Sequence, residues 1–127
     1  MIIKRLLQES NRLFVVLTIL YTLALLILSL VSKADLPEPD FSFADKVFHF
    51  VAYAILAFLW YNVFFRHYNM NMRKALSYAI GFAMLFGIVL EFLQEYTTSS
   101  RQLDIYDIIA NTLGALSSLV ILRFKRI

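Results

Sequence analysis

Long apolar runs separated by short polar segments dominate the chain. The run at 13–32 holds no charged residue, and a basic residue flanks it on each side. About 20 apolar residues, rising 1.5 Å each along a helix, cross the hydrocarbon core of a bilayer. Three similar runs follow, so the pattern predicts transmembrane helices at about 13–32, 47–65, 75–92 and 105–122. The last two are short, and we expect extension into flanking polar residues or local thinning of the bilayer.

The polar segments between these runs predict the loops. Residues 33–46 contain two prolines, which interrupt a helix, together with several acids. A basic turn is expected at 66–74 and a polar loop at 96–103. The predicted fold class is therefore all-α, an integral membrane bundle of four transmembrane helices that forms a single domain over 1–127.

The first run has a rival interpretation as a cleaved signal peptide. Ser32-Lys33-Ala34 has the small residues of a signal-peptidase site, and the amino end is basic. The apolar core of a signal peptide is roughly 7–15 residues long, however, and this run is longer. A first transmembrane helix is the preferred prediction.

Composition supports a membrane protein and excludes other classes. The chain is 61% hydrophobic with a mean hydropathy of +0.71, whereas soluble domains are about 45–50% apolar. It has no cysteine, which excludes disulfides and thiolate chemistry. The sequence pI is about 9.3, but the basic residues form short clusters between apolar runs. That pattern indicates membrane orientation, and no nucleic-acid partner is expected.

The distribution of charge predicts the orientation of the helices. The amino end, the turn at 66–74 and the carboxyl end together hold nine of the twelve Lys and Arg residues and one acid. The other side of the membrane, with its two loops and the helix ends beside them, holds eight of the nine acids. The positive-inside rule then places both termini in the cytoplasm, an N-in/C-in arrangement.

Small residues at four-residue spacing predict close helix packing. Gly81 and Gly87 belong to such pairs in the third run, and Ala110, Gly114 and Ser118 form a longer series in the fourth. Small residues let backbones approach in lipid, where van der Waals contact drives helix association. We therefore expect helix contacts at Gly81, Gly87 and Gly114.

Polar residues gather at the outward ends of the last three helices. Steps of three and four place Asp104, Asp107 and Asn111 on one helical face. His49 and Asp107 lie about 3 Å into their runs, and Tyr53 and Asn111 lie about 9 Å in. Distant segments thus supply one layer, which predicts an outward-facing polar pocket. Its candidate binding residues are Asp45, Lys46, His49, Tyr53, Glu91, Gln94, Arg101, Asp104, Asp107 and Asn111.

A structural interpretation competes with the pocket. Polar residues at helix ends meet water and headgroups, so an isolated Asp45 or Asp104 also suits a cap. An Asp at a membrane helix centre costs roughly 2.5–3.5 kcal/mol, so such groups normally face the bundle interior and pair there. Pairing of Arg101 with Glu91 or Asp107 would satisfy the charges without a ligand.

The same residues resemble the VanZ-like family of small bacterial membrane proteins. The shared pattern is Asp-Lys-x-x-His-x-x-x-Tyr, Glu-x-x-Gln and Arg-x-x-Asp-x-x-Asp-x-x-x-Asn-x-x-Gly, which begins here at Asp45, Glu91 and Arg101. The resemblance covers about 46–122, with Ser118 where members often carry a second glycine. It implies a multi-pass protein of the bacterial cytoplasmic (inner) membrane. The family's namesake is associated with antibiotic resistance, as reduced susceptibility to the lipid-tailed glycopeptide teicoplanin.

Three function classes follow. In the first, the pocket binds a cell-envelope component, such as a lipid headgroup, a lipid-linked cell-wall precursor or a glycolipid. Arg101 and Lys46 would contact phosphate there. In the second, His49, Glu91 and Asp107 are catalytic residues of a hydrolase or transferase acting on such a molecule. In the third, the protein is a transport or structural subunit, which ranks lower because no polar path reaches the cytoplasmic half.

The enzyme hypothesis has a weak sequence signal. No HExxH or GxSxG motif occurs, and no nucleophile stands out. One histidine with scattered carboxylates is a poor predictor of zinc, so neither a metal nor another cofactor is predicted. Membrane lipids are the expected partners, while the ligand, any reaction and the oligomeric state stay open.

Overall fold

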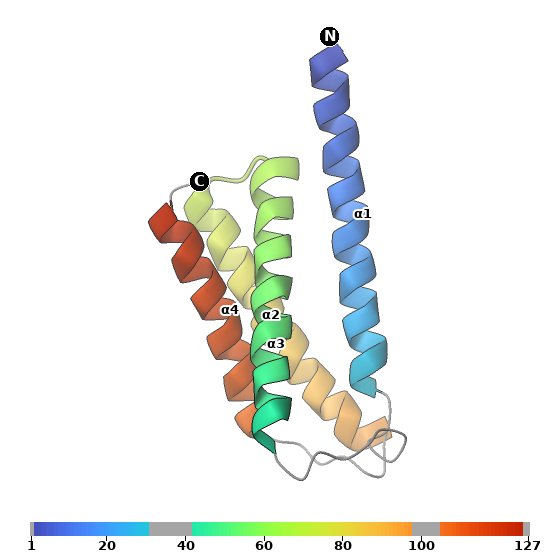
Figure 1. The fold of residues 1–127 in the computed structure, drawn as a ribbon, viewed down its shortest axis with the longest axis vertical. Coiled ribbons are helices and arrows are strands. Elements are labelled where there is room, and N and C mark those ends of the chain that lie inside the picture. Colours follow the sequence, from blue (N-terminus) through green and yellow to red (C-terminus); the bar gives the residue numbers. More distant parts are fainter. Residues whose placement is uncertain (1, 31–41, 98–104, 126–127) are drawn as a thin grey trace.

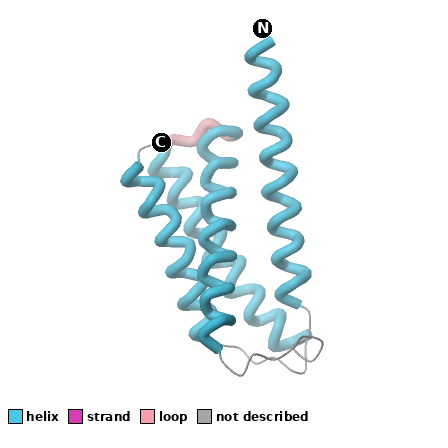
Figure 2. Tube along the Cα trace, viewed as in Figure 1, coloured by secondary structure: helices cyan, strands magenta, loops and turns pink. Residues whose placement is uncertain are grey.

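The fold is an all-helical bundle, seen in a computed structural model that describes residues 2–30, 42–97 and 105–125. Its helices are α1 (Ile2–Leu30), α2 (Ser42–Asn62), α3 (Met72–Thr97) and α4 (Ile105–Lys125), and a π-helical turn, η2 (Val63–His67), follows α2. The described residues contain no strand. In Figure 2, the connection between α2 and α3 is the one described part of the chain not drawn as helix. The prediction of an all-α, four-helix fold is confirmed.

Four helical segments are long and apolar enough to cross a membrane, one each in α1, α3 and α4 and one that runs from α2 through η2. These segments are Glu9–Leu30, Lys46–His67, Met72–Tyr96 and Ile105–Phe124. The predicted third and fourth spans were short, but α3 and α4 have 26 and 21 residues. Both helices extend into the flanking polar residues. A helix of 21 residues is about 32 Å long, which matches the hydrocarbon thickness. The chain is a multi-pass membrane protein.

The helices extend beyond several of the predicted membrane spans. α1 begins at Ile2 rather than near residue 13, and the amino-terminal part of α1 extends beyond the ends of the other helices (Figure 1). α2 begins at Ser42, so the end of the predicted 33–46 loop is helical. Polar residues at a helix end meet water without unwinding the backbone, so hydropathy marks the membrane span and not the whole helix.

The turn between α2 and α3 is shorter than the predicted 66–74. Tyr68 N–H donates to Val63 O at 3.2 Å, a π-type bond. Asn69 adopts a positive φ of 56°, which reverses the chain. Asn71 then caps α3, because its Oδ1 accepts from the backbone N–H of Lys74 at 2.8 Å. The basic residues of this segment therefore belong largely to helix ends.

Close packing joins α2 to α4 and to α3. A Cβ added at Gly114 would overlap the backbone of Phe50, lying 3.0 Å from its Cα and nearer still to its carbonyl. Ala79 and Ala83 are fully buried along α3, and Gly87 is also buried. The packing predicted for Gly87 and Gly114 is thus seen as contact within the bundle.

Gly81 is different, because the described residues make no close contact with it, and the predicted packing there stays a prediction. It is exposed, and a Cβ placed on it would meet no described atom within 4 Å. Gly81 and Gly87 lie six residues apart, about 600° around a helix of 3.6 residues per turn, so they cannot share a face. Spacing alone does not reveal which small residue faces a neighbour.

The first helix packs on the side of the bundle through side-chain hydrogen bonds. Within the described residues α1 contacts α2, η2 and α3, and it does not contact α4. Tyr21 Oη donates to Ala52 O at 2.7 Å, and Trp60 Nε1 donates to Thr22 Oγ1 at 3.0 Å. In lipid such bonds help to hold helices together, because an apolar side chain that moves from lipid to a helix interface gains no hydrophobic stabilisation.

Candidate functional site

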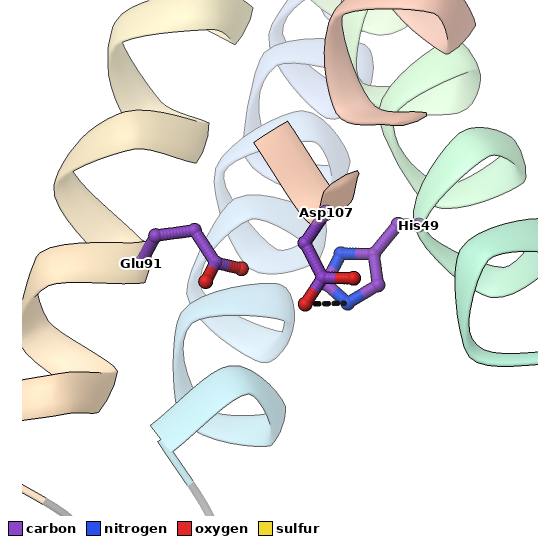
Figure 3. A group of neighbouring side chains, drawn as sticks. All are labelled: His49, Glu91 and Asp107. Carbon is purple, nitrogen blue, oxygen red and sulfur yellow. Dashed lines mark ion pairs between the residues drawn. The ribbon is translucent and has the colours of Figure 1, made fainter. Parts of the chain in front are cut away.

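Three helices bring ionisable side chains together at the end of the bundle opposite the chain termini. His49 on α2, Glu91 on α3 and Asp107 on α4 point toward one another (Figure 3). Each offers a nitrogen or oxygen atom, and these atoms lie within 4.8 Å of one another. The three residues are 7%, 2% and 3% exposed. The inward, converging arrangement expected of these three is present, and with Lys46 and Asn111 they are called the polar centre below.

His49 is held by an amide on α4. Its Nδ1 lies 2.9 Å from Asn111 Oδ1. An amide oxygen can only accept a hydrogen bond, so Nδ1 carries the hydrogen and donates it. The other ring nitrogen, Nε2, lies 3.6 Å from Asp107 Oδ2. The imidazole thus spans one helical turn of α4, with a fixed ring orientation.

Asp107 forms an ion pair on its other oxygen. Lys46 Nζ donates to Asp107 Oδ1 at 2.5 Å. The Lys46 side chain is 22% exposed and that of Asp107 is 5% exposed, so the lysine approaches from the more open side. Lys46 was not predicted as a partner of Asp107, and the predicted pairing of Arg101 with Glu91 or Asp107 lies outside the described residues. The two oxygens of this carboxylate face different groups.

Below the ionisable groups lies a layer containing Tyr53 and Asn111. Both are buried, at 2% and 3% exposed. A Cβ on Gly87 would lie 3.0 Å from Asn111 Nδ2 and 3.2 Å from Tyr53 Cε2. Gly87 therefore provides the space on α3 in which these two side chains meet. Sequence spacing predicted the shared layer but not that a glycine makes room for it.

Gln94, a predicted binding residue, contacts the first helix. Its Nε2 donates to Ser29 O on α1 at 2.5 Å. This contact was not predicted, because an apolar helix gives no sign of which backbone carbonyl accepts a bond from another helix. The side chain of Asp45 and all of Arg101 and Asp104 lie outside the described residues, so their predicted roles stay predictions.

The arrangement suits acid-base or cation chemistry. One imidazole, two carboxylates and one ammonium group lie together in a water-poor environment, where charge interactions are strong. Carboxylates in such an environment attract a partner that donates hydrogen bonds or carries positive charge.

Comparison with known proteins gives one match. The family model described as VanZ/LLP1 matches residues 3–126, nearly the whole chain, and this range includes every residue of the polar centre. Searches of curated proteins and of solved structures find no significant match. A match over this length shows the family, so the protein is a membrane-spanning member of the VanZ/LLP1 family.

Proposed function

We propose that the protein binds the polar headgroup of an envelope lipid or lipid-linked precursor at the polar centre. The observation that carries this proposal is the convergence of His49, Glu91 and Asp107 from three helices, each more than nine-tenths buried. Burying three ionisable groups in a membrane bundle is costly, and such groups commonly mark a functional pathway or site. A bundle that needed packing alone would be more stable with apolar side chains there.

We further propose that the polar centre lies toward the outer face of the bacterial inner membrane. Basic side chains gather at the opposite end of the bundle, where Arg12, Arg66 and His67 line a cavity of about 360 Å³. Cytoplasmic ends of membrane helices carry an excess of Lys and Arg. This distribution supports cytoplasmic termini, and it would place the polar centre where envelope lipids and glycopeptide drugs act.

A lipid-borne ligand suits the surroundings of the polar centre. An apolar groove of about 220 Å³ lies between α1 and α2, and Phe48 and Val51 contribute to its lining. His49 lies between these two positions in sequence and faces the bundle interior. A headgroup at the polar centre and an acyl chain in the groove would therefore contact neighbouring faces of α2.

Photo-crosslinking with a diazirine-bearing envelope lipid extract tests this proposal. We expect labelling of the purified protein that falls at least about tenfold in Glu91→Gln, since a lost hydrogen bond to a charged group weakens binding by about 1.5–3 kcal/mol. Glu95→Gln is the matched control, because Glu95 lies one turn further along α3 and is exposed. Equal labelling of both variants and the wild type would contradict a headgroup site at the polar centre.

A second candidate function is catalysis on the same molecule. The observation that favours it is the position of His49 between Asn111 Oδ1 and Asp107 Oδ2, since an oriented imidazole beside a carboxylate is a common general base. Turnover of a labelled lipid by the wild type, lost in His49→Gln, would establish an enzyme. Photo-crosslinking to lipid without turnover would support binding and contradict catalysis.

A further inference from the structure

The distances at the polar centre fit donors that share one metal ion. Metal–ligand bonds of about 2.0–2.2 Å place two donors on a tetrahedral Zn²⁺ about 3.4 Å apart. His49 Nε2 and Asp107 Oδ2 are 3.6 Å apart. All three donor atoms, including one from Glu91, lie within 4.8 Å of one another. A small change in the side-chain torsions of Glu91 would bring the third donor to the same ion.

The ring orientation of His49 is an independent indication. Because Nδ1–H donates to Asn111 Oδ1, Nε2 is the ring nitrogen placed to bind a metal ion. It faces the Oδ2 of Asp107, so an ion between these two atoms would contact both. Histidines that bind metals usually donate their other N–H to an oxygen, as His49 does here.

The ion pair of Lys46 is compatible with a bound ion. Lys46 donates to Oδ1 of Asp107, whereas the histidine faces Oδ2. Asp107 can therefore bind a cation through Oδ2 and keep its hydrogen bond from Lys46 at Oδ1. Carboxylates that bind metals commonly accept such a hydrogen bond from a residue outside the ligand set.

We propose that His49, Glu91 and Asp107 bind a divalent cation of the Zn²⁺ or Mn²⁺ type, with Asn111 orienting the histidine. Imidazole and carboxylate donors together suit these ions. This inference deepens the proposed function, on which it rests, because a bound divalent cation would attract the phosphate of a lipid headgroup. Three protein donors leave further coordination positions at which that phosphate could bind.

Metal titration of the purified protein in detergent tests the proposal. After chelator treatment we expect about one Zn²⁺ to bind per chain, and Co²⁺ to give a visible absorption band typical of nitrogen and oxygen ligands. His49→Gln, Glu91→Gln and Asp107→Asn should each weaken Zn²⁺ binding by more than about 100-fold. Loss of a residue that only hydrogen-bonds to a metal ligand already costs about 10–100-fold in metal affinity. Glu95→Gln, with its exposed carboxylate, should bind as the wild type does.

Asn111 supplies a second test that a purely structural network would not pass. Asn111→Ala should weaken Zn²⁺ binding about 10–100-fold and shift the Co²⁺ band, because the histidine loses its orienting acceptor. Asn111→Asp keeps an acceptor oxygen and should restore most of the binding. Unchanged Zn²⁺ affinity in folded Glu91→Gln and Asn111→Ala, or no Zn²⁺ binding by the folded wild type, would overturn the proposal.

The two proposals fail separately. Crosslinking to lipid that persists in chelator-treated protein, together with absent metal binding, would remove the metal ion and keep the headgroup site. Metal binding without any lipid crosslinking would keep the cation site and remove the proposed function. Lipid crosslinking that needs Zn²⁺ and is lost in Glu91→Gln would support both.

Discussion

Phe50 and Gly114 bring the backbones of α2 and α4 into direct contact. The Cα of Phe50 is 3.0 Å from the place where a Cβ on Gly114 would lie, and its carbonyl is closer still. His49 precedes Phe50, and Asn111 lies one turn before Gly114. The contact therefore also sets the distance between His49 and Asn111, whose side chains form a hydrogen bond.

Replacement of Gly114 by alanine should destabilise the bundle. The added methyl group would meet backbone and not a flexible side chain, so the helices must separate. We expect a loss of about 1–3 kcal/mol in the free energy of unfolding, measured by denaturant unfolding in micelles. Gly81→Ala is the control, because its Cβ would meet no described atom within 4 Å, and it should be neutral or stabilise slightly. Equal losses in both variants would contradict the packing described.

The ion pair of Lys46 and Asp107 should contribute more than a surface pair. Removing one partner of a buried pair costs about 3–5 kcal/mol, and since Lys46 is 22% exposed we expect about 2–3 kcal/mol for Lys46→Met. In the double variant Lys46→Met/Asp107→Asn the loss should be smaller than the sum of the single losses, because neither charge is left alone. Strict additivity of the two unfolding free energies would show that the residues do not interact.

The hydrogen bond of Tyr21 to Ala52 should help to hold α1 on α2. Bonds of this type between membrane helices contribute about 0.6 kcal/mol on average, with a maximum near 1.7 kcal/mol. Tyr21→Phe should lower the free energy of unfolding within that range. Tyr96→Phe is the matched control, since Tyr96 is 87% exposed at the end of α3. A loss in the control as large as that in Tyr21→Phe would argue against a specific role for this hydroxyl.

The proposed orientation can be read by cysteine labelling, because the natural chain has no cysteine. Tyr96→Cys lies at the end of the bundle that holds the polar centre, and Asn69→Cys lies in the turn at the other end. With cytoplasmic termini, a membrane-impermeant maleimide should label Tyr96→Cys in intact spheroplasts, and Asn69→Cys after lysis. The opposite pattern would place the polar centre at the cytoplasmic face.

The sequence predicted the helices well because each span is a continuous apolar run, and hydropathy needs no tertiary information. The inward groups were also predictable, since His49, Glu91 and Asp107 are ionisable at membrane depth, and such groups avoid lipid. Their partners were not predictable. Which cation reaches Asp107 depends on the start of α2 and on helix orientation, so the contact of Lys46 was found only in the structure.

The attachment of α1 was missed for a similar reason. Tyr21, Thr22 and Ser29 lie in an apolar run whose composition signals a span and nothing more. Hydrogen bonds to Ala52, Trp60 and Gln94 arise only once the helices are side by side. The early start of α1 has a local explanation, because Arg5 and Glu9 form an i,i+4 pair at 3.6 Å on an exposed helical surface.

The position of α1 has a consequence for how a ligand arrives. Since α1 does not contact α4 within the described residues, the donors at the polar centre are assembled by the other three helices alone. A shift of α1 in the bilayer plane would therefore leave that assembly intact, although it would break the hydrogen bonds that α1 forms with α2 and α3. For the proposed lipid ligand, such a shift would open a sideways route along which the acyl chains stay out of water.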